Sequence, residues 1–481
     1  MAKSSVTLAV VAGLFSATIL PAAASDWPLF GFDSARSSFN SAERTLNRHN
    51  VGHLRERWQT ALGDVADSTP ILLERVRVGR ATIPMLYQTT KSGVTLAINA
   101  TTGKIMWRFA THGSQITDST PAADPSGKAI YAPGVDGKIH KLSAGRGHEM
   151  HAPGFPARIT RLPQTEKDAS PLNVANGYLY AVTSGYYGDA PPYDGHVVAV
   201  RLSDGKTTVF NSLCSNYRKL PTSSSCPDQR SGIWGRGGAV VDPDPTMNGR
   251  VYAATGNGKF DANSNGGTDY GDTLLSLSAD LSDLLGSYTP TNYQQLNYGD
   301  TDLGSSSPGI LPTLASSQTP YLLVEGGKDA ILKLLNRAAL PGVGGELQEV
   351  DLPGGLFSAP AIWGDGSSNP WIFLGFSDTV TAYRLQTSSS GASMLHNVWQ
   401  VNPGNSSGEG SSPVVANGIL FVAFSSNLVA LNAATGAMLW SSAQGGGPNI
   451  GSIHWESPIV VNGWVYCSDQ SGNLTAFSLK K

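Results

Sequence analysis

Side chains that could bind and oxidise a small molecule recur at the ends of predicted strands in the middle of the chain. Trp234 lies in a glycine-rich run, Asn257 follows Thr-Gly after an apolar run, and Lys328 follows Glu-Gly-Gly. Between them, Asp300 and Asp302 lie in an aspartate-rich turn. An aromatic face, an amide, a carboxylate and an ammonium are what a ring of sheets would offer a flat, anionic ligand at its axis.

Each of these residues also has a purely structural interpretation. Asp300 follows a glycine and could simply form a turn, and Asn257-Gly258 favours a tight turn in the same way. Trp234 could pack in the core, and Lys328 could be a solvated residue at a rim. The stretch His454-Trp455-Glu456 begins a later repeat and could also face the axis, although a single His is more often structural.

A repeated pattern, Ser or Ala followed by Pro and an apolar strand, indicates the architecture. The seventh unit contains four short apolar runs at 413–415, 419–422, 427–431 and 438–440, separated by Gly and Asn turns. Units begin at Ser68, Ser119, Ala169, Gly237, Ser306, Ser358, Ser411 and Glu456, and the unit at Gly237 lacks the proline. Four strands in a period of roughly 45–60 residues are typical of a β-propeller blade.

The two ends of the chain are expected to close this ring. The eighth unit stops at 474–478 without a fourth strand, and an unpaired strand lies at 54–61, before the first unit. Pairing the two removes an open sheet edge. Trp58 has the same position in its unit as Trp107, Trp399 and Trp440, which we interpret as wedges between blades. The prediction is an all-β fold in one domain from 25 to 481: an eight-bladed β-propeller of four-stranded antiparallel blades, with the N-terminal strand in the last blade.

Residues 1–24 have the pattern of a cleaved signal peptide. Lys3 precedes an apolar run at 6–20, and three alanines at 22–24 form a small-residue cleavage site. We therefore expect a periplasmic or secreted protein with no transmembrane segment after cleavage. The net charge is −3, and the sequence contains no block of basic or acidic residues, so a nucleic-acid partner is not expected.

The chain has three cysteines. In an exported protein, Cys214 and Cys226 could close a local loop as a disulfide, which leaves Cys467 as a buried thiol. The sequence contains no Cys-x-x-Cys-His stretch, so no covalently attached c-type haem is expected.

The blade ends, such as Ala100-Thr101-Thr102-Gly103-Lys104 followed by Trp107, resemble those of the eight-bladed pyrroloquinoline quinone (PQQ) propellers. That family contains quinoprotein alcohol dehydrogenases and also cofactor-free scaffolds. The likeness runs from about Asp26 to Lys481, and the start at Asp26-Trp27-Pro28 is similar as well. Because the fold alone does not carry the activity, the site residues have to be matched one by one.

The resemblance implies a role for each residue of the central stretch. Trp234 matches the tryptophan that stacks on the quinone, and Asn257 matches the asparagine that binds the metal. Lys328 matches the cation that bonds the quinone oxygens. Asp300 is the nearer match to the catalytic aspartate, which also approaches the metal, and Asp302 is the alternative. Calcium would act as the Lewis acid beside PQQ.

The sequence departs from the dehydrogenases at two places. It has no Cys-Cys pair to cover the second face of the quinone. The blade-three turn at 184–193 has no glutamate for the metal, and Asp189 would have to substitute. In spite of these departures, the resemblance implies a PQQ- and calcium-dependent dehydrogenase of an alcohol, polyol or sugar. The alternative is a non-catalytic periplasmic scaffold for a protein or a cell-envelope polymer.

Overall fold

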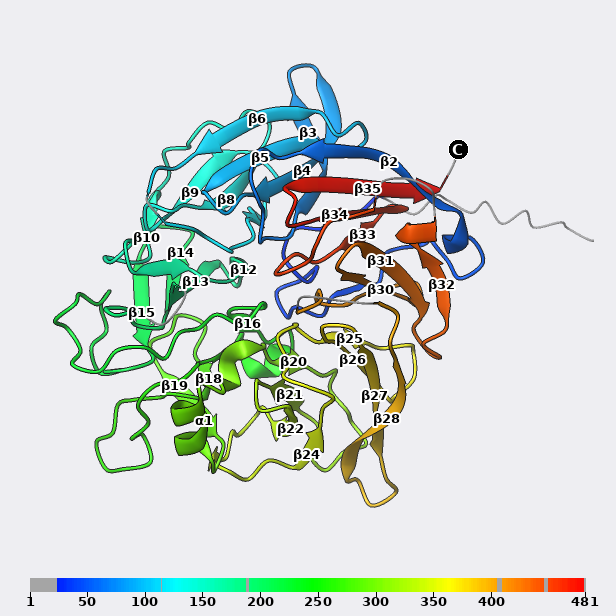
Figure 1. Cartoon of the computed structure of the whole chain (residues 1–481). Coiled ribbons are helices and arrows are strands. Elements are labelled where there is room, and N and C mark those ends of the chain that lie inside the picture. Colours follow the sequence, from blue (N-terminus) through cyan, green and yellow to red (C-terminus); the bar gives the residue numbers. More distant parts are fainter. Residues whose placement is uncertain (1–23, 114, 187–189, 405–408, 445–448, 480–481) are drawn as a thin grey trace, which may run out of the picture.

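The computed structural model describes residues 24–113, 115–186, 190–404, 409–444 and 449–479. The strands of these residues form eight sheets arranged as the blades of a ring around a central axis (Figure 1). The first strands of neighbouring blades contact one another around that axis. The fold predicted from the repeats is therefore confirmed.

Within each blade the strands follow one another outward from the axis as an antiparallel meander. Blade 1 contains β3 (Ile71–Val78), β4 (Ala81–Thr89), β5 (Val94–Asn99) and β6 (Ile105–Ala110), and blade 2 contains β7 (Ala122–Ala123), β8 (Ala129–Pro133), β9 (Lys138–Ser143) and β10 (Ala157–Arg158). Blade 3 contains β12 (Asn173–Ala175), β13 (Tyr178–Gly185), β14 (His196–Arg201) and β15 (Thr207–Asn211), and blade 4 contains β16 (Val240–Val241), β17 (Val251–Ala254), β18 (Leu274–Leu277) and β19 (Leu284–Thr289). Blade 5 contains β20 (Gly309–Ile310), β21 (Leu322–Gly326), β22 (Ile331–Asn336) and β24 (Gln348–Asp351), and blade 6 contains β25 (Ala361–Trp363), β26 (Trp371–Gly375), β27 (Val380–Thr387) and β28 (Ser393–Val401). Blade 7 contains β29 (Val414–Ala416), β30 (Ile419–Phe424), β31 (Asn427–Asn432) and β32 (Met438–Ser441), and blade 8 contains β33 (Ile459–Val461), β34 (Trp464–Ser468), β35 (Asn473–Leu479) and β2 (Leu54–Ala61).

Three short strands extend this pattern. β11 (Glu166–Asp168) pairs with β13, while β1 (Phe39–Asn40) and β23 (Gly342–Val343) lie parallel to β29 and β19. One α-helix, α1 (Tyr293–Gly299), occurs in the described residues, between blades 4 and 5. Nothing helical in the described part of the chain combines the length and the apolar character needed to cross a membrane.

The ring closes with the strand expected from the sequence. β2 pairs antiparallel with β35 from Leu54 opposite Leu479 to Ala61 opposite Asn473. Figure 1 shows the two strands side by side, although they come from opposite ends of the chain. This pairing leaves no blade short of its fourth strand.

The tryptophans at equivalent positions join neighbouring blades. The indole N–H groups of Trp58, Trp107 and Trp399 donate to the backbone carbonyls of Ala100, Ala144 and Ala433 in the next blade, at 3.2, 3.0 and 3.1 Å. The indole of Trp440 donates to the carbonyl of Leu54 at 3.2 Å. A glycine at the blade turn packs on the ring in three of these contacts. A Cβ added at Gly103, for example, would lie 2.8 Å from Trp58. The repeated Thr-Gly turn therefore makes room for a wedge tryptophan.

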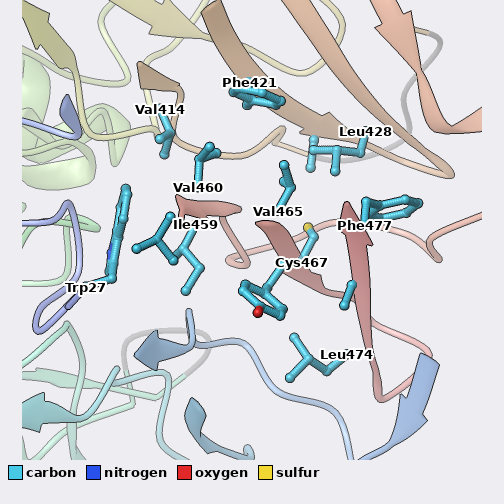
Figure 2. Close-up of a cluster of buried hydrophobic side chains, with 14 of the residues drawn as sticks. Trp27, Val414, Phe421, Leu428, Ile459, Val460, Val465, Cys467, Leu474 and Phe477 are labelled. Carbon is cyan, nitrogen blue, oxygen red and sulfur yellow. The ribbon is translucent and has the colours of Figure 1, made fainter. Parts of the chain in front are cut away.

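The largest buried apolar cluster fills the space between blades 7, 8 and 1. Figure 2 shows Phe421 and Leu428 of blade 7 on one side and Val465 and Phe477 of blade 8 on the other. Cys467 lies inside this cluster and is a free, buried thiol, as predicted. The other prediction about cysteines is confirmed too, because Cys214 and Cys226 form a disulfide.

The segment from Asp26 to Asn40 binds the first strands of the blades along the axis. Its backbone bonds with Leu72 of blade 1, Val241 of blade 4 and Val415 of blade 7. The buried guanidinium of Arg36 donates to four backbone carbonyls, among them those of Gly237 and Pro171. The N-terminal segment thus ties the blades together and leaves the loops that precede the first strands to form the site.

Candidate functional site

A cavity of about 500 Å³ lies on the axis, among the loops that precede the first strands. Trp234, Asn257, Asp300 and Lys328, the residues singled out in the sequence, all line it, and so does Asp302. The propeller therefore brings these residues of blades 4 and 5 to one place.

Aromatic rings form one wall of the cavity. The ring of Trp234 stacks with that of Trp455, with centroids 5.9 Å apart and planes at 22°. The imidazole of His454 stacks on Trp455 at 5.0 Å and 11°. Both tryptophans are only half-buried, so part of each indole remains open to the cavity. His454 and Trp455, which the sequence analysis named as residues that could face the axis, belong to this wall.

A buried cation supports this wall from behind. The guanidinium carbon of Arg236 lies 4.4 Å from the centroid of Trp455, a cation–π contact. Arg236 also donates to the backbone carbonyls of Gly410 and His454, and it lies 3.5 Å from the carboxylate of Glu409. Burial lowers its pKa to about 10, so the side chain stays charged at neutral pH. Blades 7 and 8 are thereby joined to the loop that carries Trp234.

Lys328 connects the aromatic wall with a carboxylate. Its ammonium lies 5.1 Å from the centroid of Trp234 and 2.6 Å from Oδ2 of Asp302. The other carboxylate oxygen, Oδ1, accepts the backbone N–H of Asn257 at 2.6 Å. A Cβ at Gly256 would lie 2.8 Å from Oδ1 of Asp302, so this position has to be glycine. Trp234, Asn257, Asp302 and Lys328 form one connected set.

Asp300 has a different environment. It ends helix α1 in a left-handed conformation, with φ of 51°, and its side chain is 65% exposed. The ammonium of Lys328 lies 3.4 Å from Oδ1 of Asp300, farther than from Asp302. The side chain of Asp302 is 4% exposed. The structure thus favours Asp302 over Asp300 as the carboxylate that could act on a bound ligand.

Burial and neighbouring charges set the protonation of this carboxylate group. Burial raises the pKa of Asp302, and the ammonium of Lys328 partly offsets that rise. Burial opposes the charge of Lys328, but Asp302 and Asp300 together raise its pKa. Asp272, which accepts the backbone N–H of Leu303 at 3.1 Å, has a pKa of about 8 because it is buried and near the charge of Asp302. At neutral pH Asp272 is thus largely protonated, while the ion pair favours the ionised form of Asp302.

The cavity also contains charged residues that the sequence reasoning missed. Lys167 forms an ion pair with Asp118 in the wall between blades 2 and 3. Arg230 lines the mouth, and its guanidinium has no ion-pair partner among the described residues. A signal for Asp118 was present, because Asp67 and Asp118 both stand directly before Ser-Thr-Pro in their repeats. Lys167 and Arg230 lie in stretches with no repeated pattern.

A buried polar network lies behind His454. Its Nδ1 is 3.2 Å from Oδ2 of Asp67, which is also 2.5 Å from the ammonium of Lys91. Burial opposes protonation of His454, but Asp67 raises its pKa. The side-chain amide of Gln470 donates to Asp67 and, at 2.5 Å, to Glu456. Burial and the charge of Asp67 raise the pKa of Glu456 to about 7. Charge on the imidazole is thus balanced by Asp67.

The donor set suits a flat polyanion better than it suits a divalent ion. The half-buried indoles of Trp234 and Trp455 offer part of their aromatic surface, and Lys328, Arg230 and Lys167 offer positive charge to carboxylates or carbonyls. For a hard cation, the lining residues with side-chain oxygens include Asn257 and Asp302, and Asp302 is already paired with Lys328. Asp189, the third ligand suggested by the sequence, lies outside the described residues.

Comparison with known families gives two matches. Residues 27–280, more than half of the chain, match the family described as glucose/ethanol/alcohol dehydrogenase, β-propeller domain. Residues 396–481 match the family described as outer membrane protein assembly factor BamB. No curated protein matches the sequence.

Solved structures of similar shape include several dehydrogenases. The quinohemoprotein alcohol dehydrogenase ADHIIG of Pseudomonas putida HK5 has 13% identity and a TM-score of 0.64, over 94% of this chain and 80% of that one. The corresponding enzyme of Comamonas testosteroni has 15% identity and a TM-score of 0.60, with the same coverage. A europium-containing methanol dehydrogenase has 14% identity and a TM-score of 0.64, over 94% of this chain and 98% of that one. At such identities these likenesses establish the fold.

Proposed function

The chain belongs to the β-propeller family of the glucose, ethanol and alcohol dehydrogenases, and from this membership and its axial cavity we propose that it binds PQQ and oxidises an alcohol, polyol or sugar. The observation that carries the proposal is the set formed by Trp234, Lys328 and Asp302. This set places an aromatic face, a fixed cation and a buried carboxylate at one wall of a cavity large enough for a cofactor and a small substrate.

The residues of the cavity divide into binding and reacting groups. The indole of Trp234 supplies the stacking face, and Lys328 and Arg230 bind the oxygens of the anionic cofactor. When bound, PQQ supplies the two-electron acceptor for the substrate carbon. Asp302 takes the hydroxyl proton, because its pairing with Lys328 favours the ionised form and its burial shields it from bulk water.

Calcium is the metal we propose for this site. The side-chain oxygen of Asn257 and the carboxylate of Asp302 are the described groups that would hold it, since carboxylate and amide oxygens are the ligands that calcium prefers. A bound calcium would compete with Lys328 for Asp302. Chelation of the metal should therefore change the pH dependence of the reaction as well as its rate.

We also propose that the protein acts outside the cytoplasm. The support is the pattern of residues 1–24, a basic residue followed by an apolar run and three alanines. Sequencing the N-terminus of the protein recovered from a periplasmic extract tests this. A start near Ser25 is expected, and an intact Met1 in a cytoplasmic fraction would contradict it.

The match of residues 396–481 to the assembly-factor family supports a second candidate, a scaffold that binds an envelope protein or polymer. The two functions differ in what Trp234 and Lys328 do. The enzyme needs both for cofactor binding, whereas the scaffold would keep its partner after both are replaced by Ala.

Reconstitution tests the proposed function. Purified protein is titrated with PQQ, with and without calcium, and tryptophan fluorescence is recorded. Dye-linked oxidation of a panel of alcohols, polyols and sugars follows. We expect saturable quenching that Trp234→Ala abolishes and that Trp363→Ala leaves intact, because Trp363, at the end of β25 in blade 6, is not among the residues that line the cavity. If PQQ does not bind below about millimolar, a free energy of roughly −4 kcal/mol, the scaffold is favoured.

A further inference from the structure

A second, much smaller cavity lies beneath the aromatic wall, enclosed by the loops that precede the first strands of blades 1 to 3, by Phe30 of the N-terminal segment, and by Arg236 and Trp455. Its volume is about 10 Å³, measured as space for the centre of a water molecule, and this is close to the minimum for one bound water. Asp118 and Trp455 line both cavities, so they form the partition between them.

Four buried residues at this small cavity have a side-chain atom without a hydrogen-bond partner among the described residues. One of these atoms, Oδ2 of Asp67, is held in ion pairs with Lys91 and His454. The other three atoms are Oγ1 of Thr69, Oδ1 of Asp118 and Nε of Arg236. The three side chains belong to residues that are 2%, 4% and 3% exposed. Buried polar atoms are paired in the great majority of cases, so three such atoms around one cavity need an explanation.

The other atoms of the same side chains are fully engaged. Oδ2 of Asp118 is paired with Lys167, and the two terminal nitrogens of Arg236 bond with Gly410, His454 and Glu409. The backbone N–H of Thr69 donates to the hydroxyl of Thr120 at 2.9 Å, which fixes the strand that carries it. Oδ1 of Asp118 and Nε of Arg236 thus cannot turn elsewhere without breaking existing bonds.

We propose that this cavity binds one ordered water molecule, which ties Arg236 to Asp118 and Thr69. The N–H of Arg236 is a donor, Asp118 is an acceptor, and the Thr69 hydroxyl can be either, so a water can accept one bond and donate two. A metal cation is disfavoured here, because Arg236 is itself positive and Asp118 is already neutralised by Lys167. The water fixes the guanidinium under Trp455, and so Thr69 and Asp118 are positioning residues for the floor of the larger cavity.

A pair of variants at Thr69 tests this proposal. Thr69→Val keeps the shape but removes the hydroxyl, and Thr69→Ser keeps the hydroxyl. Crystal structures of the full chain and of both variants, at a resolution that shows ordered solvent, are compared. We expect a single water peak within hydrogen-bond distance of Arg236 Nε and Asp118 Oδ1 in the wild type and in Thr69→Ser. In Thr69→Val the peak should be weakened or lost, and the guanidinium of Arg236 should shift.

Two results would overturn the proposal. One is empty density in the wild type. The other is a peak stronger than water with oxygen contacts of about 2.3–2.6 Å, which would identify a calcium-like cation. A thermal melt of each variant is the second measurement, in which Thr69→Ser should keep the wild-type Tm and Thr69→Val should lower it. An equal Tm for the valine variant, with an unmoved Arg236, would also count against the water. None of these measurements depends on PQQ.

Discussion

The ammonium of Lys328 lies 2.6 Å from Oδ2 of Asp302, in an ion pair whose carboxylate is almost completely buried. This contact separates two aspartates that the sequence could not distinguish. Asp300 lies two residues earlier, but its side chain is exposed at the end of helix α1. A base has to be held within reach of the proton that it removes, and of the two aspartates that contact Lys328, Asp302 is the buried one and is also held by the backbone N–H of Asn257.

Replacing Asp302 should therefore affect turnover far more than replacing Asp300. In Asp302→Asn a neutral amide cannot accept the proton, and we expect kcat of the reconstituted enzyme to fall by about 10²–10⁴-fold, the usual contribution of a general base. Asp300→Asn is the matched control and should change kcat less than about threefold, since its side chain is exposed. Dye-linked kinetics measure both. The assignment is reversed if Asp300→Asn is the inactive variant.

Lys328→Ala should weaken the binding of PQQ without unfolding the propeller. A charge-assisted hydrogen bond to a ligand oxygen contributes about 1.5–3 kcal/mol, so the Kd should rise by roughly 10–150-fold. Fluorescence titration of the apoprotein measures the Kd directly. The control is Lys104→Ala, an exposed lysine at a blade turn far from the cavity, which should bind as the wild type does.

If the affinity for PQQ is unchanged in Lys328→Ala, Lys328 does not bind the cofactor and is a solvated residue at the rim of the cavity. Lys328→Arg separates charge from geometry, because it keeps the charge but spreads it over a planar fork. If charge alone matters, the arginine variant should bind nearly as well as the wild type.

The eight-bladed propeller and its closing strand could be predicted from the sequence because their signals are local and repeated. Trp58, Trp107 and Trp399 recur with a glycine turn in the neighbouring unit, and the structure shows that this glycine makes room for the indole ring. The position of the closing strand could be predicted because the eighth unit has only three strands and the strand at 54–61 belongs to no unit. The structure pairs the two.

The site could be predicted only in part, because its contacts join residues that are distant in sequence. Nothing local tells that Lys328 pairs with Asp302 or that Trp455 stacks with Trp234. Those relationships depend on where the axis runs. Arg230 was missed for the same reason, since only the folded ring places it at the mouth of the cavity.

The buried carboxyl of Asp272 should make stability depend on pH. Its pKa rises from 3.8 to about 8 in the folded protein, through burial and then the charge of Asp302. The stabilising contribution of the protonated form is complete below pH 3.8 and is lost as the pH rises through about 8. Asp272→Asn mimics the protonated form. We expect the Tm of this variant to exceed that of the wild type by a margin that grows from pH 4 to pH 8. A margin that does not change with pH would show that Asp272 is ionised throughout.

The disulfide predicts a simple thiol count. Denatured, unreduced protein should show one reactive thiol, at Cys467, and reduction should raise the count to three. In the native state that thiol should not react, because burial raises its pKa well above the usual range. Cys214→Ser with Cys226→Ser should lower the free energy of unfolding by about 2–4 kcal/mol, as expected for a short closed loop. Three thiols in the unreduced protein would rule out the bond.

Removal of residues 26–62 should make the protein aggregate. The deletion takes away β2, which pairs along the length of β35, and the N-terminal segment that bonds with several first strands. The exposed edge of β35 then offers unpaired N–H and C=O groups to other chains. Light scattering after size-exclusion chromatography measures the aggregation. The control is Arg57→Ala, which keeps the strand and removes one of its side-chain bonds to Ser478. A synthetic peptide covering 54–61 should partly restore the monomer if the edge is the cause. A truncated protein that stays monomeric with an unchanged Tm would show that the last blade is stable with three strands.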